Sequence, residues 1–299
     1  MNGIINIYKP SGESSFQTVN RVKKILGANK CGHTGTLDPI AEGVLPVCVN
    51  QATKLSDYIM AFEKEYIAEI VLGKKTDTMD ITGKVLKENS NCYLEKNQLE
   101  NILDSFTGNI CLKIPSYSSV KIGGKRAYQL ARKGMIEDAG SRHTYIKNIE
   151  LLNYEFPTFI VKVKCSKGTY IRSLVDAIGE QSGCYAVMSG LVRSKNGHFD
   201  MRDSLTPDDL KNKVAEGDFS FFIPVNNVLN WPVAVIKNEV IERVFNGMDP
   251  EKQDYLRLPL EDGEYFFIST PDGKIAAFSK KIYEGKKPLK LVKVFKNFL

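Results

Sequence analysis

The strongest constraint on this chain is one stretch in which a single acidic residue lies between two residues that restrict the backbone. Residues 33–54 are HTGTLDPIAEGVLPVCVNQATK, and Asp38 lies between Gly35 and Pro39. Glycine adopts backbone conformations that are closed to other residues, and proline drives the residue before it towards an extended conformation. We therefore expect Asp38 on a stiff loop rather than on a helix.

The residues around Asp38 decide between two interpretations. A lone aspartate before proline is most often a turn residue. The whole stretch, however, closely resembles the catalytic loop of the TruB family of tRNA pseudouridine-55 synthases. This resemblance implies that Asp38 is the catalytic carboxylate. A lone histidine in a loop is usually polar surface, but the resemblance implies that His33 contacts the RNA.

The bulk composition permits a nucleic-acid partner without requiring one. The chain has 299 residues, of which 42% are hydrophobic, which suffices for one large core and a smaller second one. A net charge of +6 makes it mildly basic. The six cysteines form no CxxC pair, which argues against a zinc ribbon. With no signal peptide and no long apolar run, we expect a cytoplasmic protein with reduced thiols and no membrane contact.

The N-terminal residues predict a strand followed by a capped helix. Residues 3–8 are rich in isoleucine and predict a buried strand, which residues 9–12 end. Ser14 and Gln17 have the spacing of a capping box. An apolar stripe then recurs at helical spacing: Phe16, Val19, Val22, Ile25 and Leu26.

Residues 64–72 predict a strand that carries a candidate stacking residue. Apolar and polar residues alternate along it, with Tyr66 near its start. An aromatic residue in a strand belongs to the core about as often as not. The string KEYIAEIVLG resembles a TruB motif whose tyrosine stacks on the target base, and the resemblance implies this role for Tyr66.

A second strong motif follows a strand predicted over residues 159–165. The string CSKGTYIRSL leads through a glycine turn into a helix with a buried stripe, and it resembles a TruB motif. The resemblance implies that Arg172 pairs with Asp38 and that Tyr170 lies in the nucleotide pocket. A guanidinium would keep the carboxylate ionised and aimed. The alternative is a surface salt bridge, but a helix N-terminus disfavours a cation.

A third, shorter motif supplies a candidate pocket residue. Residues 190–194, GLVRS, resemble a pocket strand of the family, which implies that Leu191 lines the uracil site; a leucine in such a run is otherwise ordinary core. Two positions depart from the family pattern. Val192 stands where the family usually has arginine, and Asn50 stands where it usually has glycine.

Residues 115–145 combine basic side chains with an aromatic one. Tyr128 is surrounded in sequence by Lys121, Lys125, Arg126, Arg132 and Lys133. This pattern suits contacts to phosphates and stacking on a base, although a charge run alone is more often a solvated helix face. The segment resembles an insertion that clamps tRNA in the family, and Arg142 extends the same basic cluster.

Two further motifs allow either a structural role or an RNA contact. The segment KPSGESS resembles the first TruB motif, and we expect Lys9 to buttress the Asp38 loop or to contact RNA. Asp77 and Asp80 could be metal ligands or turn formers, but their spacing lacks the ligand series of a calcium loop. Residues 76–83, TDTMDITG, resemble a motif of the family, which needs no metal. This leaves Asp80 as an RNA-facing or structural residue.

The sequence changes character after Trp231. Short strand-like runs occupy residues 265–268, 275–278 and 289–295, and from Lys274 onward eight lysines stand against one glutamate. This basic, β-rich region resembles the PUA-like RNA-binding domain of TruB chains. We therefore predict a pseudouridine synthase catalytic domain over residues 1–231 and a PUA-like domain over residues 232–299.

Taken together, the resemblance implies an enzyme with a mixed α+β fold around a largely antiparallel central sheet. It would isomerise uridine 55 in the tRNA T loop without cofactor or metal, as a monomer that binds the T arm and needs no guide RNA. A carboxylate suits chemistry at an anomeric carbon as nucleophile, oxocarbenium stabiliser or base. Two other hypotheses stay open: an RNA chaperone that only binds, and a metal-dependent phosphohydrolase that uses Asp38.

Overall fold

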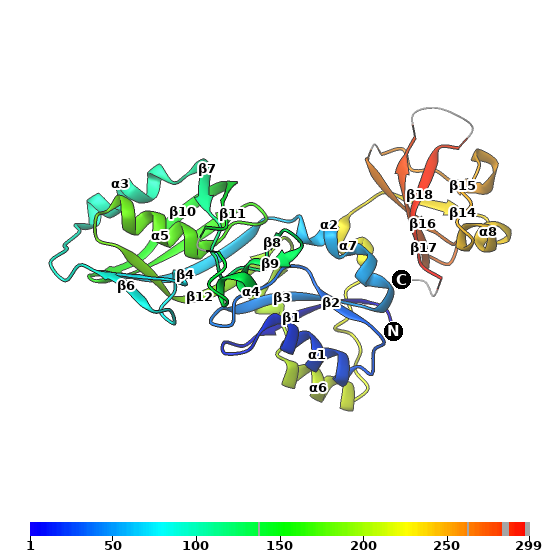
Figure 1. Cartoon of the computed structure of the whole chain (residues 1–299). Coiled ribbons are helices and arrows are strands. Elements are labelled where there is room, and N and C mark those ends of the chain that lie inside the picture. Colours follow the sequence, from blue (N-terminus) through cyan, green and yellow to red (C-terminus); the bar gives the residue numbers. More distant parts are fainter. Residues whose placement is uncertain (137, 262, 283–286, 297–299) are drawn as a thin grey trace.

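The computed structural model describes residues 1–136, 138–261, 263–282 and 287–296, in which two large β-sheets organise the chain (Figure 1). The larger sheet has the strand order β1 (Gly3–Lys9), β3 (Glu42–Val49), β12 (Ala186–Asn196), β4 (Lys64–Leu72), β11 (Thr158–Cys165), β10 (Ser141–Glu155) and β7 (Gly108–Lys113). Two short strands pair at its side, β2 (Cys31–His33) with β3 and β13 (Phe199–Asp200) with β12.

The strand pairing confirms a largely antiparallel central sheet. Among the described strands of this sheet, only β3 and β12 pair in parallel, through Val192 opposite Glu42 and Arg193 opposite Gly43. The alternation predicted for residues 64–72 is present, with Tyr66 on the buried face of β4. Helices α3 (Lys96–Ser105) and α5 (Ile171–Gln181) pack with this face around the main hydrophobic core.

Helix α1 (Ser15–Ile25) begins where the capping box predicted, and α6 (Pro207–Ala215) packs against it. Val19 and Val22 are buried with Leu210 of α6 and with β1 residues in a second core. The prediction that Phe16 belongs to this stripe is wrong, because its side chain is exposed. The contacts that bury the stripe start one turn later, so the first turn of α1 leaves its aromatic ring in solvent.

The smaller sheet is formed entirely by residues after Pro232. Its order is β15 (Tyr255–Arg257), β14 (Val233–Ile236), β16 (Tyr265–Ser269), β17 (Ile275–Lys281) and β18 (Leu289–Val294). The three predicted strand runs are present, while β14, β15 and the short helix α8 (Ile241–Phe245) have weak sequence patterns. A mixed fold with a separate β-rich C-terminal sheet is thus confirmed.

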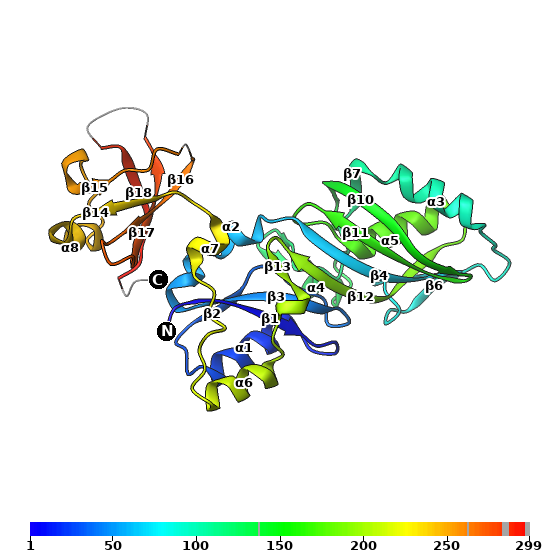
Figure 2. The same cartoon turned by 180° about the vertical axis from the view of Figure 1, so that it is seen from behind.

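An aromatic cluster lies at the linker that contains α7 (Val225–Leu229). The view from behind shows this linker between the larger and the smaller sheet (Figure 2). Trp231 stacks on Tyr265 of the smaller sheet, with ring centroids 5.0 to 5.1 Å from those of Tyr58, Tyr265 and Phe267. Tyr58 lies in α2 (Ser56–Met60), so the contact links the linker to both parts of the chain.

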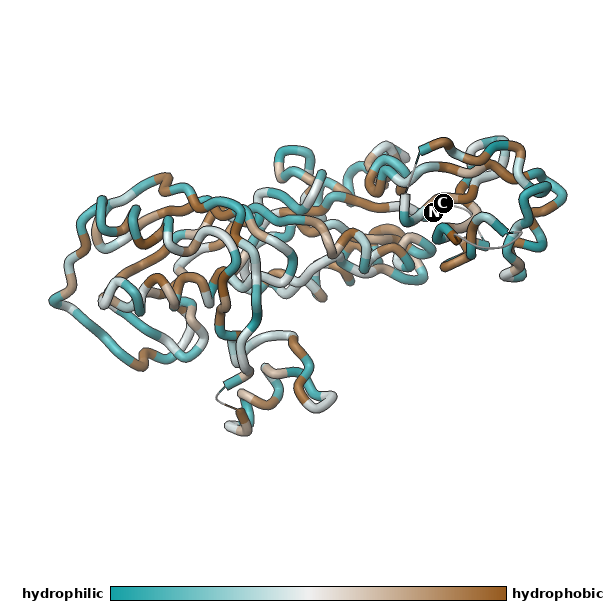
Figure 3. The backbone as a smooth tube through the Cα atoms, turned by 90° about the horizontal axis from the view of Figure 1, so that it is seen from above, coloured by the Kyte–Doolittle hydropathy of each residue, from teal (hydrophilic) through white to brown (hydrophobic). Residues whose placement is uncertain are grey.

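The insertion segment, described over residues 114–136 and 138–140, connects β7 to β10. It contains β8 (Lys121–Ile122), β9 (Lys125–Arg126) and α4 (Ala127–Ala131). Seen from above, it stands out from one side of the molecule (Figure 3). The remaining elements are β5 (Lys74–Thr76), β6 (Val85–Glu88), η1 (Asn50–Leu55), η2 (Met201–Asp203), η3 (Asn238–Val240) and η4 (Lys252–Asp254). No helix in the described part of the chain is long and apolar enough to cross a membrane.

Candidate active site

Asp38 lies on the loop between β2 and β3, and a set of backbone contacts holds this loop against the start of α1. Ser15 Oγ accepts from Leu37 N at 2.8 Å and lies 3.0 Å from Leu37 O. The buried Lys9 ammonium donates to the carbonyls of Pro10, Glu13 and Pro39. Gly35 has φ +138°, a conformation that side chains rarely adopt. The loop is therefore stiff, as its sequence predicts.

Arg172, at the N-terminus of α5, grips the Asp38 carboxylate from the other side. Its Nη2 donates to Oδ1 at 3.1 Å, and its Nε lies 2.8 Å from Oδ2. The Arg172 side chain is 4% exposed and that of Asp38 is 32% exposed. A two-atom contact of this kind fixes the direction of a carboxylate. Arg172 thus holds the Asp38 carboxylate from one side, while the carboxylate stays accessible from the cavity.

Arg172 is itself held by residues far away in sequence. It donates to the carbonyls of Thr78 at 2.9 Å and Tyr117 at 3.1 Å. Asp80 Oδ2 lies 3.9 Å from its Nη1, and Asp80 Oδ1 accepts from the backbone and hydroxyl of Thr82. Because the Asp80 side chain is buried, the structure gives it a supporting place behind Arg172 and contradicts the RNA-facing alternative.

Lys9 is likewise a support rather than a contact surface. Its side chain is buried, and burial lowers its pKa to about 8. All three of its acceptors lie on the Asp38 loop or on the turn before α1. This geometry favours the expectation that Lys9 buttresses the loop over the expected RNA contact.

A cavity of about 510 Å³ brings most of the predicted site residues together. It is lined by His33, Asp38, Tyr66, Tyr170, Arg172 and Leu191 and by Arg126 and Arg142 from the basic cluster. Tyr66 is 8% exposed, and burial raises its phenol pKa while Arg193 acts in the opposite direction. Burial also raises the pKa of Tyr170. A ring, an apolar side chain and a fixed carboxylate thus share one space.

His33 lines this cavity in a form that suits stacking. Its Nδ1 accepts from Gly35 N at 3.3 Å. Burial, and then the charges of Arg193 and Arg126, lower the pKa of the imidazole. A neutral ring at neutral pH follows, and such a ring can lie against a base or fill a gap in a base stack.

The outer basic residues lie on the insertion segment. Lys121, Lys125 and Arg132 are exposed and do not line the cavity, and the Arg132 guanidinium lies 5.6 Å from the Tyr128 ring centre. Arg126 lines the cavity and donates to Ser119 O at 2.8 Å. The cluster therefore runs from the cavity edge outward along the protruding segment.

Two buried cations of the cavity wall were missed in the sequence. Lys64 donates to the carbonyls of Met60 and Phe62, and Arg193 donates to those of Gly35 and Val44. Arg193 shares strand parity with Leu191, two residues before it, which is the signal that could have found it. Val192, which departs from the family pattern, lies between them in the strand and does not line the cavity.

The other departure, Asn50, has a local explanation. Its φ is +52°, in the left-handed region that favours glycine and tolerates asparagine. Its Oδ1 accepts from Asn29 N and Lys30 N, and its Nδ2 donates to Met1 O. Asparagine can therefore take the place of glycine here, because its side chain forms three hydrogen bonds that hold this backbone conformation.

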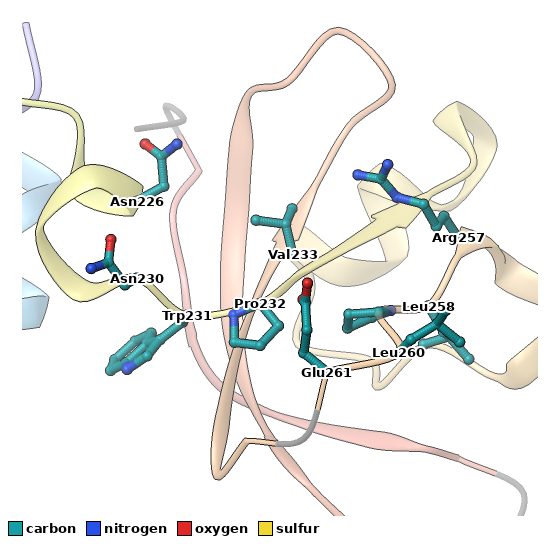
Figure 4. A pocket seen from close by; sticks show the side chains of 10 residues that line it. Asn226, Asn230, Trp231, Pro232, Val233, Arg257, Leu258, Leu260 and Glu261 are labelled. Atoms are coloured by element: carbon teal, nitrogen blue, oxygen red, sulfur yellow. The ribbon is translucent and has the colours of Figure 1, made fainter.

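A larger cavity of about 970 Å³ lies where the linker enters the smaller sheet (Figure 4). The amides of Asn226 and Asn230, apolar residues, Arg257 and Glu261 line it, and Trp231 points away from Arg257 and Leu260. None of the predicted catalytic residues belongs to its lining. The predicted catalytic residues line the cavity of about 510 Å³ instead.

Comparisons with known proteins agree with this geometry. A model described as the N-terminal domain of TruB family pseudouridylate synthases matches residues 23–171. A protein of Clostridium kluyveri named tRNA pseudouridine synthase B is 40% identical over 266 residues, which are 89% of this chain and 91% of the relative. A protein of the same name from Clostridium tetani is 39% identical over 98% of this chain and 100% of the relative.

The solved structures give the same fold. A chain in the structure of an H/ACA RNP bound to a substrate RNA containing 2′-deoxyuridine superposes with a TM-score of 0.71. It is 26% identical, and the match covers 98% of this chain and 84% of that chain. A chain of a Cbf5-Nop10-Gar1 complex matches with the same values. The arrangement of both sheets is therefore shared with these proteins.

Proposed function

Because this chain belongs to the TruB family of pseudouridylate synthases, we propose that it converts uridine 55 in the T loop of tRNA to pseudouridine, with Asp38 as the catalytic carboxylate. The observation that carries this proposal is the Asp38 carboxylate held by Arg172 in the same cavity as Tyr66. The curated relatives named tRNA pseudouridine synthase B support the substrate class.

In the proposed isomerisation, each residue of the cavity has one part. The N1–C1′ bond breaks, the base turns, and a C5–C1′ bond forms, while C5 loses one proton and N1 gains one. Arg172 holds the Asp38 carboxylate in place for the sugar, where it acts as nucleophile, ion stabiliser or base. Because the base never leaves the pocket, one carboxylate suffices, and no second acid is needed to release a leaving group.

Tyr66 and Leu191 receive the base after it leaves its stack. Flipping a base out costs a few kcal/mol, and stacking on an aromatic ring returns about 1–3 kcal/mol. The Tyr66 ring and the Leu191 side chain line the same cavity as Asp38, so a stacked uracil would hold its glycosidic bond near the carboxylate. Tyr170 contributes a further wall, and His33 lies against the neighbouring RNA.

The RNA partner follows from the charges around the cavity. Arg126 and Arg142 at its edge and Lys121, Lys125 and Arg132 farther out provide contacts for phosphates of the T arm. Lys30 and Lys54 line a separate cavity of about 480 Å³ before β2 and offer two further cations. We propose a monomeric, cytoplasmic enzyme. We also propose that it needs no guide RNA, because its 40% identity to a tRNA pseudouridine synthase B exceeds its 26% identity to the chain of the H/ACA RNP.

The proposal is tested by mapping pseudouridine in tRNA incubated with the purified protein and with Asp38→Asn. The wild-type protein should modify uridine 55, also in a T-arm hairpin and in the presence of a chelator. Asp38→Asn should form no pseudouridine while its Kd for tRNA stays within about threefold, since one carboxylate adds little to phosphate binding. Turnover by Asp38→Asn rejects the catalytic role, and inhibition by the chelator favours the phosphohydrolase.

A further inference from the structure

Arg193 is a fully buried cation whose position links three parts of the active site. It lies on β12, directly opposite Tyr66 of β4 and Gly43 of β3 in the sheet register. Its side chain is 1% exposed. Neighbouring strands project side chains of paired residues to the same face, so the register alone brings Arg193 beside the Tyr66 ring.

The Arg193 guanidinium closes the loop that carries Asp38. Its Nη2 donates to Gly35 O at 3.0 Å, and its Nε donates to Val44 O at 2.7 Å. Gly35 precedes Asp38 by three residues, and Val44 follows it at the start of β3. One side chain therefore bridges both ends of the loop, and its planar fork fixes their separation.

The same guanidinium lies beside Tyr66 in the sheet register, lines the same cavity and acts against the effect of burial on the phenol pKa. Arg193 thus joins the Asp38 loop to the ring on which the base is proposed to stack. The backbone is built for this contact: Gly43 has φ +102°, and a Cβ there would lie 2.4 Å from Arg193 O. The parallel pairing of β3 with β12 requires glycine at this point.

A buried cation needs a reason to stay in the fold. Taking a guanidinium out of water is costly, and here it donates to two backbone carbonyls beside the Tyr66 phenol. Lys64 and Lys9 are buried close enough for Arg193 to lower their pKa, which adds repulsion. A purely packing role would be served better by an apolar side chain of similar volume.

We propose that Arg193 is a positioning residue that sets the distance and angle between the Asp38 carboxylate and the Tyr66 ring. This inference rests on the proposed function, because it assigns a role within the same site. Arg193 acts through the loop and the phenol, and the base meets Asp38 and Tyr66. Its loss should therefore change the rate of the bound complex more than the affinity for RNA.

The test compares Arg193→Met, Arg193→Lys and Tyr66→Phe, with Arg202→Met as a matched control at an exposed arginine bound to Asp200. Single-turnover conversion of tRNA at saturating enzyme should fall about 100-fold in Arg193→Met, the loss typical of a misplaced catalytic group. The Kd for tRNA should stay within about threefold, since Arg193 contacts no phosphate. Arg193→Lys should keep more of the rate, and Arg202→Met should match the wild type.

The link through Tyr66 is tested by the double variant. The rate losses of Arg193→Met and Tyr66→Phe should not multiply, because both remove the proposed contact between the guanidinium and the phenol. Losses that multiply, or an Arg193→Met rate within twofold of the wild type, would overturn the proposal. If Arg193→Met does not fold, Arg193→Lys takes its place in the cycle, since an ammonium keeps the charge but removes the planar fork.

A readout without activity separates this inference from the proposed function. Hydrogen exchange of the amides of residues 35–44 in the full chain should be faster in Arg193→Met than in the wild type and unchanged in Arg202→Met. If the wild-type protein formed no pseudouridine, the proposed function would fail while the exchange result still decided on the loop bridge. Unchanged exchange in a folded Arg193→Met would overturn the bridge itself.

Discussion

The floor of the active-site cavity, which contains Arg172 and Arg193, differs from the insertion segment in the burial of its charged side chains. In the floor, Arg172 and Arg193 are 4% and 1% exposed and donate to fixed acceptors. They belong to a regular helix and a long strand. In the insertion segment, Lys121, Lys125 and Arg132 are exposed, on two-residue strands and after a five-residue helix.

This difference in burial separates two electrostatic roles, the orientation of a neighbouring group and the attraction of phosphates. A buried guanidinium acts at short range in a low dielectric and orients one neighbour. Exposed cations act on the phosphate backbone without regard to base sequence, and salt screens them. Floor substitutions should therefore slow the bound complex, and insertion substitutions should weaken binding. Each prediction below tests one side of this division.

The largest effect is expected for Arg172→Met. Loss of the fork leaves the Asp38 carboxylate without its fixed partner, and removal of one preorganised charge contact costs about 100- to 1,000-fold in rate. Single-turnover conversion of tRNA measures this, with the Kd for tRNA as the control for binding. Arg172→Lys should remain strongly impaired, because an ammonium cannot contact both carboxylate oxygens in the same way. A normal rate in Arg172→Lys would contradict the role of the fork.

A smaller loss of rate is expected for Asp80→Asn. The amide can still accept from Thr82, but the charge 3.9 Å from Arg172 Nη1 is gone. We expect a rate about tenfold lower, equivalent to about 1.4 kcal/mol. Asp77→Asn, in the same loop but bonded to Lys84 N, is the control. Equal losses in both variants would show a general effect of the loop rather than support of Arg172.

The sequence predicted those parts of the site that depend on local backbone chemistry. Gly35 and Pro39 frame Asp38, and the glycine turn before α5 places Arg172, so each candidate stood in a recognisable strand or loop context. The capping box of α1 was equally local. Mixed α+β architecture followed from alternating strands and from the family resemblance, and both sheets are present. The domain boundary near residue 231 stays a prediction.

The remaining parts depend on which elements pack together. The contact of Arg193 with Gly35 requires the parallel pairing of β12 with β3, far apart in sequence. The burial of Lys9 and Asp80 follows from tertiary contacts that motif spacing does not encode. Phe16 continues the helical pattern of Val19 and Val22, yet α6 covers only the later turns. The polarity of a residue gives it a preference for burial or exposure, and the packing of the elements decides which of the two occurs.

On the insertion side, the triple variant Lys121→Gln, Lys125→Gln and Arg132→Gln should weaken binding with little change in rate at saturation. Each phosphate contact removed should lower the slope of log Kd against log salt by about one. Lys211→Gln with Lys252→Gln, exposed in α6 and η4, serves as a charge control. Titrations of tRNA between low and moderate salt give the slope. An unchanged slope would place the phosphate contacts elsewhere.

The smallest effect concerns stability and the buried Lys9 beneath the Asp38 loop. Its pKa is lowered from 10.5 to about 8, first by burial. Between these values the unfolded chain binds the proton and the folded chain does not, so the free energy of unfolding rises with pH. Relative to Lys9→Met, the wild type should gain at most about 1.36 kcal/mol per pH unit in this window. Urea unfolding at pH 7.5, 9 and 10 measures the gap, with Lys211→Met as the exposed control. If the difference in free energy of unfolding between the wild type and Lys9→Met did not change with pH, Lys9 would be charged and solvated in the folded chain. The cations beneath the cavity would then behave like the exposed cations of the insertion segment.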